Sequence, residues 1–593
     1  MSAQTSEPMG DAQPLRLSVS DTAGDAASST SLGQIKKGLT GSAAKKSIKL
    51  MRGSVAALAQ RDYRRGAELA LEALKLDEKL GLAWHLLAIS REKSGQTTQA
   101  ILAYEAAVKL LPDESAVAAD LGRLAQRMGQ LEIAEKLYLK HLATHPGHIE
   151  VTNNLATSQR DQGRYGDAIE TLRSMIAFAP QEPMLWNTLG TVLSDKGDMG
   201  GSVVFFDEAL RLDPAFTKAL YNRANVRMAL GDVHQSLADI AMALSQIEDP
   251  QERDTIRMAK AMTEMFAGNL VTGFEDYEAR FSTHLPEAVS FVTKCPLLTL
   301  EDDLLGRHVL VMGEQGLGDE VLFANVLPDL LAAIGPDGHM TLAVEHRLIP
   351  LMRRSFPGST IVAHRTARID GRLTRMADGQ NDDRVPDYWT PIGSLFRHFR
   401  TTQAAFPSTR NYLQPDPARV AYWKQELDNA SSAPKVGVVW KSLRLEGMRL
   451  RYFAPFDLWR PVLSNPDVMF VNLQYGDVSE EIEAAKAQGI SFWTPPGINL
   501  KDDLDDLAAL TCAMDLVIGP PNATSNIAAA CGVPWWAFST PDDWQRFGTD
   551  RFPCYPSVRI FPIDGFGEWE GAMARVGDAL TAWSTSGIAG NAR

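Results

Sequence analysis

The hydrophobic pattern between residues 81 and 213 repeats every 34 residues. Each repeat has a proline after a helical stretch, and these are Pro112, Pro146, Pro180 and Pro214. Within that stretch a bulky residue follows a small one by a helical turn, in the pairs Ala100 and Tyr104, Ala134 and Tyr138, Ala168 and Leu172, and Ser202 and Phe206. The preceding stretch carries another small position, occupied by Ala88, Gly122, Ala156 and Gly190. Antiparallel helices approach closely only where a residue lacks bulk, and proline ends the second helix because it cannot continue the hydrogen-bond ladder.

A period of 34 residues with these columns is typical of tetratricopeptide repeats. A chance spacing in an ordinary helical bundle does not explain why several columns stay in phase. We therefore predict an α solenoid over residues 48–250, with an early degenerate repeat at Ser54–Leu76 and a drifting unit that ends at Gln246. Such solenoids have a concave face that mostly binds other proteins or peptides.

The pattern changes at residue 308, where short apolar runs begin to alternate with helical stretches. Continuous apolar runs are typical of parallel strands that are covered on both faces. The runs are His308–Gly313, Met340–Glu345, Thr360–Ala363, Lys435–Trp440, Met469–Leu473, Asp515–Gly519, Val533–Phe538 and Val558–Phe561. A proline-containing stretch near Phe406–Pro417 divides them. We therefore predict two doubly wound halves, at 296–415 and 416–593, with ligands in the cleft beyond the carboxyl ends of the strands.

The segments outside these domains differ in composition. Residues 1–47 are rich in small and polar residues, so we predict a disordered tail there. A helical connector is expected at 251–295, and the aromatic residues of its last helix, Gly273–Phe281, are expected to dock on the next domain. The amphipathic C-terminal helix, Trp569–Trp583, is expected to cross back onto the first half.

The charge and cysteine content restrict the function and the compartment. The formal net charge of -14 argues against broad binding to nucleic acid or anionic membranes. Cys295, Cys512, Cys531 and Cys554 are far apart and form no CxxC pair, which favours neither a disulfide framework nor a zinc site. The sequence has no apolar run of membrane-spanning length and no secretory signal pattern at the N-terminus. We therefore expect a cytoplasmic protein.

A glycine-rich turn, GEQGLGDE at residues 313–320, follows the first predicted strand and precedes a helix. Gly316 and Gly318 let the backbone approach a ligand closely, and Glu314 and Asp319 are candidate catalytic bases. The turn is not a phosphate-binding P-loop, because no Lys-Ser/Thr pair follows it. The alternative is a helix start at which acidic residues interact favourably with the helix dipole.

A second polar loop follows the predicted strand at 515–519. Asn522, Thr524, Ser525 and Asn526 there present side-chain donors and backbone N–H groups at the start of a helix. Such a site suits a phosphate group. The alternative is a plain helix N-cap, which requires only one of these residues.

A basic loop follows the predicted strand at 435–440 and contains Lys441, Arg444, Arg449 and Arg451. Cations clustered at a predicted cleft of an acidic protein favour an anionic ligand. The alternative is a solvated charged loop. The acidic run at 502–506 opens a helix, where carboxylates suit the dipole, so we predict no metal site there.

Together these stretches resemble bacterial tetratricopeptide proteins fused to a GT-B glycosyltransferase domain that is related to the heptosyltransferases. The motifs that carry the resemblance are GEQGLGDE, DYWTPIGSL at 387–395, VGVVW at 436–440, DLAALTCAMDLVIG at 506–519 and PWWAF at 534–538. The resemblance implies an α solenoid followed by an α/β GT-B fold with two Rossmann-like halves. It also implies that Asp319 is the catalytic base and that Lys441 contacts the donor phosphates.

The chain departs from most relatives in the second polar loop. Where they carry Asp-Thr and a later histidine, this chain has Pro521, Asn522 and Asn526. That argues against an ADP-heptose donor. The flagellin-modifying members are similar here, and they are thought to attach nonulosonic acids such as pseudaminic acid from CMP-linked donors. The basic loop would suit the carboxylate of such a sugar.

The resulting hypothesis is a metal-independent protein O-glycosyltransferase that uses a nucleotide sugar as substrate and no cofactor. Its repeats would bind an acceptor protein, flagellin, and Asp319 would deprotonate a serine or threonine hydroxyl. The alternatives are a non-catalytic adaptor or chaperone with a relic transferase domain, an O-GlcNAc-type or heptosyl-type transferase, and a transferase with a lipid-linked glycan as acceptor.

Overall fold

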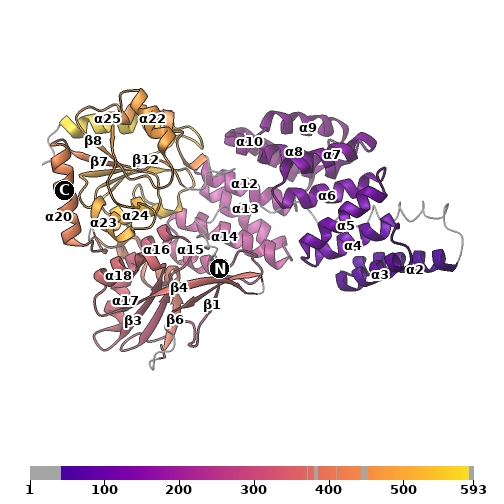
Figure 1. Ribbon diagram of the computed structural model, residues 1–593, viewed down its shortest axis with the longest axis horizontal. Helices are drawn as coiled ribbons and strands as arrows, with labels where there is room; N and C mark the ends of the chain where they lie inside the picture. The colour runs from indigo at the N-terminus through magenta and orange to yellow at the C-terminus, as the bar shows by residue number, and fades with distance from the viewer. Residues whose placement is uncertain (1–41, 370, 379–384, 409–410, 443–450, 586–593) are drawn as a thin grey trace. The chain divides into compact units, whose positions relative to one another are not determined.

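The computed structural model (Figure 1) describes residues 42–369, 371–378, 385–408, 411–442 and 451–585. The described residues form two compact units, with the boundary between Asn222 and Arg223 in helix α12 (Thr217–Ala229). The first unit consists of helices and their connections, and the second begins with helices and continues into two β-sheets. None of the helices in these ranges is long and apolar enough to cross a membrane.

In the first unit, consecutive helices pack against each other. Their bounds are α2 Ser42–Ala59, α3 Tyr63–Leu76, α4 Gly81–Lys93, α5 Thr97–Leu110, α6 Ser115–Arg127, α7 Leu131–Thr144, α8 Ile149–Asp161, α9 Tyr165–Phe178, α10 Pro183–Lys196 and α11 Met199–Leu212. Helix α2 begins before residue 48, the predicted start of the solenoid, and Ser47 is already buried in it. The rest of the predicted tail, 1–41, lies outside the described residues.

The 34-residue period has the packing that the sequence predicts. Each marker proline lies just beyond the end of a second helix, as Pro112 does after α5. The small and bulky columns are buried. A Cβ atom placed on Gly122 would lie 2.8 Å from Cε1 of Tyr138, and one placed on Gly190 would lie 2.7 Å from Cε1 of Phe206. These glycines leave room for the aromatic ring of the partner helix, which sets the spacing within each helix pair.

Replacing Gly190 by alanine is therefore expected to destabilise the solenoid, although alanine favours helices. Overpacking against Phe206 should lower the free energy of unfolding by about 1–3 kcal/mol. The matched control is Gly166→Ala, because Gly166 is exposed in α9 and has nothing within 4 Å of an added Cβ. The control should gain up to about 1 kcal/mol. Urea unfolding followed by circular dichroism measures both, and equal stabilities for the two variants would contradict the packing argument.

The second unit opens with helices that continue the repeat pattern less regularly. They are α13 Val233–Gln246, α14 Pro250–Ala267, α15 Leu270–Tyr277 and the 3-10 turn η3 Glu278–Phe281. The ring of Phe274 lies 5.4 Å from that of Phe396 and 5.8 Å from that of Phe547, and the ring of Tyr277 lies 6.4 Å from that of Phe323. The predicted docking of these aromatic residues on the following region is thus confirmed.

Two six-stranded sheets follow in the described part of the chain. The first has the order β1–β5–β4–β3–β2–β6, with strands β1 Ser290–Val292, β2 His308–Met312, β3 His339–Val344, β4 Thr360–Ile369, β5 Arg372–Ala377 and β6 Tyr388–Pro391. The second has the order β12–β11–β10–β7–β8–β9, with strands β7 Lys435–Val438, β8 Met469–Asn472, β9 Phe492–Trp493, β10 Leu516–Gly519, β11 Trp535–Ser539 and β12 Val558–Pro562. Every predicted apolar run contributes a strand, and the two groups form separate sheets.

The sheets also contain features that the sequence did not predict. Strands β1, β5, β6 and β9 are short or partly exposed, so they leave no continuous apolar run. Because β1 pairs with β5, the first sheet begins inside the predicted connector 251–295. The run predicted at Thr360–Ala363 pairs parallel with β3, but β4 continues to Ile369 and pairs antiparallel with β5, which the sequence did not predict. The connection between Ile369 and Arg372 is too short for a parallel crossover.

Helices cover both sheets (Figure 1). They are α16 Leu317–Phe323, α17 Leu327–Ile334, α18 Ile349–Ser355, α19 Leu395–Phe399, α20 Pro417–Ala430, α21 Arg460–Leu463, α22 Ser479–Ala487, α23 Leu504–Thr511, α24 Ala523–Ala530 and α25 Glu570–Thr585. The prediction that the C-terminal helix crosses back onto the first half was wrong, because α25 packs on α21 and β12 in the second half. Its apolar face is covered there, with Trp583 against Trp536 of β11.

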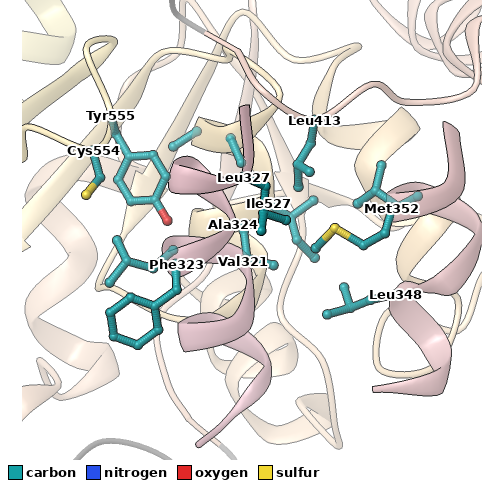
Figure 2. Close-up of a cluster of buried hydrophobic side chains, with 14 of the residues drawn as sticks. Val321, Phe323, Ala324, Leu327, Leu348, Met352, Leu413, Ile527, Cys554 and Tyr555 are labelled. Carbon is teal, nitrogen blue, oxygen red and sulfur yellow. The ribbon is translucent and has the colours of Figure 1, made fainter. Parts of the chain in front are cut away.

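The two halves share a hydrophobic core (Figure 2). Its side chains come from the first half, the connecting segment and the second half, and they include Val321, Phe323, Ala324, Leu327, Leu348, Met352, Leu413, Ile527, Cys554 and Tyr555. Helix α16 of the first half packs directly on α24 of the second. At this place the predicted cleft is filled by apolar side chains, and the loops that precede α16 and α24 are brought together.

Candidate functional site

The glycine-rich turn after β2 is anchored by a buried ion pair. Nε and a terminal nitrogen of Arg280 donate to the two carboxylate oxygens of Glu314 at 2.8 and 3.0 Å, and the backbone N–H of Gly393 donates to Oε1 at 2.7 Å. Burial alone would lower the pKa of Arg280, but the charges of Glu314 and Glu278 raise it above its ordinary value. Both oxygens of Glu314 are engaged, so the geometry favours an anchoring role over the predicted role as base.

A second arginine holds the same turn from the other side. Arg375 donates to the carbonyl oxygens of Gly313 at 2.9 Å and Gln315 at 2.7 Å. Gln315 has a left-handed backbone with φ of 57°, a strained conformation for a residue with a side chain. The two arginines therefore fix the turn in one conformation before α16 begins.

Asp319 lies in the first turn of α16 and is 6% exposed. Its Oδ2 accepts a hydrogen bond from the backbone N–H of Gly316 at 3.1 Å. This is the helix-start interaction that the sequence left open as the alternative to catalysis. The bond orients the carboxylate. A carboxylate held in this way can cap the start of the helix and can also act as a base.

Glu320, the next residue, was not predicted as part of the site. Its Oε1 lies 2.7 Å from Nε2 of His364, and its Oε2 accepts from the backbone N–H of Glu345 at 2.9 Å. The side chain is 1% exposed. The partners lie on β4 and after β3, far along the chain, so only the acidic residue itself could have been noticed from the sequence.

The polar loop after β10 forms an N-cap at the start of α24. Oδ1 of Asn522 accepts from the backbone N–H of Ser525 at 3.1 Å, and the Ser525 hydroxyl donates to the carbonyl of Pro520 at 2.9 Å. Thr524 is buried. The cap therefore accounts for Asn522 and Ser525 as local structure. Two polar atoms of the loop remain without a partner among the described residues, Nδ2 of Asn522 and Oδ1 of Asn526.

The structure brings the two predicted loops into contact. Nδ2 of Asn526 donates to the carbonyl oxygen of Gly318 at 3.1 Å. A Cβ atom on Gly318 would lie 3.0 Å from that same nitrogen, so the approach depends on glycine. The turn that carries Asp319 thus lies directly beside the start of α24.

Lys441 is held by carboxylate and carbonyl groups of the second half. Its Nζ forms an ion pair with Glu481 and donates to the carbonyl of Asp477 at 3.3 Å. Its backbone N–H donates to Oε1 of Gln474 at 2.8 Å. To bind a donor phosphate, Lys441 would have to break its ion pair with Glu481.

The rest of the basic loop is only partly described. Arg444 and Arg449 lie outside the described residues. The guanidinium carbon of Arg451 lies 4.1 Å from the ring centroid of Phe566, and a terminal nitrogen donates to the Tyr452 hydroxyl at 3.1 Å. The aromatic ring and the hydroxyl hold this cation in place.

Several buried polar atoms of the second half have no hydrogen-bond partner within the described ranges. Asn522 Nδ2 and Asn526 Oδ1 belong to the segment after β10, and Trp440 Nε1, Arg451 Nε, Trp459 Nε1, Gln545 Oε1 and Tyr555 OH belong to the segments after β7 and β11. These three strands are parallel neighbours, so their carboxyl ends meet at the same edge. Buried polar groups normally have partners. A ligand at this edge would supply partners for Asn522 and Asn526 at the start of α24.

Asp543, in the loop after β11, is a further candidate that the sequence reading missed. It is 8% exposed, and burial together with the charge of Asp542 raises its pKa to about 7. Asp542 accepts from the Tyr452 hydroxyl at 3.0 Å. The signal available in the sequence was a pair of adjacent carboxylates at a strand end.

The raised pKa of Asp543 predicts a pH-dependent stability. The unfolded chain ionises this group above about pH 4, whereas the folded chain keeps it protonated up to about pH 7. Its contribution is therefore fully present below pH 4 and is lost as the pH rises through about 7, by a few kcal/mol in total. Asp543→Asn should lose less stability than the wild type between pH 4 and 8 in urea unfolding. The exposed control Asp550→Asn should follow the wild type, and parallel profiles for all three would contradict the burial effect.

The anchoring role of Glu314 predicts a large loss of stability in Glu314→Gln. Arg280 would keep its bond to Glu278 at 2.8 Å but lose its buried counter-charge, which should cost about 3 kcal/mol. The double variant Arg280→Met with Glu314→Met should recover part of that loss, because it removes both charges of the buried pair. A Glu314→Gln protein as stable as the wild type in urea would show that the pair does not anchor the turn.

The fold defines a tetratricopeptide repeat protein whose second unit contains two largely parallel sheets. Residues 53–115, 119–183 and 185–216 match the tetratricopeptide repeat family. The predicted solenoid is confirmed over those residues. Repeats of this kind bind other proteins or peptides.

Over 571 residues the chain is 46% identical to protein FlbA of Caulobacter vibrioides, and the alignment covers 96% of this chain and 95% of that protein. The chain belongs to the FlbA family. It is also 29% identical over 119 residues to human tetratricopeptide repeat protein 7B, which is 20% of this chain and 14% of that protein. A solved tetratricopeptide repeat structure from Parabacteroides merdae is 15% identical and covers 40% of this chain and 91% of its own, with a TM-score of 0.36.

Proposed function

We propose that the chain is a GT-B-type protein O-glycosyltransferase that acts in the cytoplasm. The observation that carries the proposal is the contact of Gly318 with Asn526. It sets the turn that holds Asp319 beside the edge of the second sheet, where buried polar atoms lack partners among the described residues. Ligands of doubly wound sheets bind at such edges.

The proposed roles divide between the two halves. Asp319, on the first half, takes the proton from a serine or threonine hydroxyl of the acceptor. On the second half, Lys441 and Arg451 neutralise the phosphate of the leaving nucleotide, together with the N-terminus of α24. Cationic side chains take the part that a metal ion plays in other transferases. Arg444 and Arg449 would add to this charge.

The proposed acceptor is flagellin, held by the repeats. This choice rests on the resemblance of the sequence to flagellin-modifying transferases. The repeats also contain a largely apolar cavity of about 580 Å³, lined by Leu142, Pro146, Gly147, Thr152, Thr171, Ser174, Met175 and Phe178. Phe178 is 72% exposed. Such a cavity suits an apolar side chain of a bound protein.

The proposed donor is a CMP-linked nonulosonic acid such as pseudaminic acid. The basic residues of the loop suit a sugar that carries its own carboxylate. An O-GlcNAc-type or heptosyl-type donor would leave that additional charge without a counterpart. A lipid-linked glycan acceptor fits less well, because a small acceptor does not require a solenoid.

The second candidate is a non-catalytic adaptor or chaperone. The observation that favours it is the pairing of Lys441 with Glu481, which occupies the cation proposed for the phosphate. Calorimetry with CMP and with a CMP-linked sugar separates the two functions. An adaptor would bind neither compound, whereas the transferase would bind at least the nucleotide.

Asp319→Asn is expected to lower transfer to purified flagellin by at least about 100-fold, because the acceptor hydroxyl loses its base. Acceptor binding through the repeats should not change. The control Asp337→Asn replaces an exposed aspartate after α17 and should transfer normally. Intact-mass measurement of the flagellin follows the reaction. Undiminished transfer by Asp319→Asn would remove this residue from the role of base.

A further inference from the structure

Two cysteines lie at the ends of neighbouring helices of the second half. Cys512 directly follows α23 and Cys531 directly follows α24, and these helices pack against each other. The two thiols share a hydrogen bond. Both are partly exposed, whereas Cys295 and Cys554 are buried. Only the pair therefore combines a neighbouring sulfur with access for a small reagent.

The surroundings shift the pKa values of the two thiols in opposite directions. The hydrogen bond from Cys531 lowers the pKa of Cys512 below its ordinary value, against the opposing effect of burial, and the charge of Lys424 adds to the lowering. The same bond and burial raise the pKa of Cys531 well above its ordinary value. Cys512 is thus the sulfur that reaches the thiolate form, and Cys531 keeps its proton beside it. Redox-active cysteines commonly have this arrangement of an attacking and a resolving thiol.

We propose that Cys512 and Cys531 form a reversible redox site, a dithiol under reducing conditions and a disulfide after exposure to a peroxide. The Cys512 thiolate attacks a peroxide oxygen, the O–O bond breaks, and Cys512 becomes a sulfenic acid while hydroxide leaves. The Cys531 sulfur then attacks the Cys512 sulfur and releases water. With hydrogen peroxide, two thiols and one peroxide give one disulfide and two waters, so two electrons pass from sulfur to oxygen.

The position of the pair connects it to the rest of the second unit. Ala530, next to Cys531, accepts backbone hydrogen bonds from Tyr412 at 3.0 Å and Leu413 at 3.1 Å, which belong to the segment between the halves. Helix α23 is tied to the first half, because Asp505 pairs with Arg354 at 2.7 Å. A disulfide would join the ends of α23 and α24 at this junction. The inference does not depend on transferase activity.

The direct test is peptide mapping of the full-length wild-type protein. The reduced protein is treated with hydrogen peroxide, alkylated under denaturing conditions and digested. We expect one cross-linked peptide pair that contains Cys512 and Cys531, lighter by two hydrogen atoms than the reduced peptides and released by dithiothreitol. Cys295 and Cys554 should be recovered as alkylated thiols. Oxidation of Cys512 to sulfinic or sulfonic acid with Cys531 still a thiol, or no reaction at either residue, would overturn the proposal.

Single variants test the assigned order of reaction. In Cys531→Ser, the sulfenic acid of Cys512 has no resolving thiol and should be trapped by dimedone. In Cys512→Ser, Cys531 should react with iodoacetamide at pH 7 about tenfold more slowly than Cys512 does in Cys531→Ser. The matched control Cys295→Ser should form the disulfide as the wild type does. Faster alkylation of Cys531 would contradict the assignment, and the mapping of the wild-type protein decides the proposal if a variant fails to fold.

Discussion

The buried pair of Arg280 and Glu314 is the interaction on which the arrangement of the second unit depends. It joins the end of the helical segment to the turn after β2, and neither charge can be left alone in a dry environment without a large cost. Arg375 holds the carbonyl groups of the same turn. These contacts therefore fix the start of α16 within the second unit. Gly318 and Asp319 lie in this part of the helix.

That position determines how the halves of the second unit meet. Gly318 has no side chain, so the start of α24 approaches its carbonyl group, and the apolar faces of α16 and α24 pack into the shared core (Figure 2). The candidate base lies on one side of this contact and the cationic residues lie on the other. The proposed chemistry divides in the same way, with the acceptor hydroxyl beside the first half and the nucleotide on the second.

The sequence could predict those parts of the structure that depend on local packing. Small and bulky residues in phase define helix pairs, and apolar runs define buried parallel strands. The short strands β1 and β6, and the packing of α25, depend on partners far along the chain. The role of Glu314 depends on Arg280, and the cysteine pair depends on the packing of α23 on α24. Neither contact is visible in a local residue pattern. The loop positions of Asp319, Asn526 and Lys441 were predictable, whereas the bonds of these residues to Gly316, Gly318 and Glu481 were not.

The central claim is that the chain transfers a sugar to a protein, and the intact mass of flagellin tests it most directly. Flagellin would be purified from cells with the gene, without it, and with the gene restored. The account predicts a discrete loss of mass without the gene, equal to one sugar or a multiple of it, and recovery on restoration. An unchanged flagellin mass in all three strains would contradict flagellin as the acceptor and would leave the adaptor as the better account of this protein.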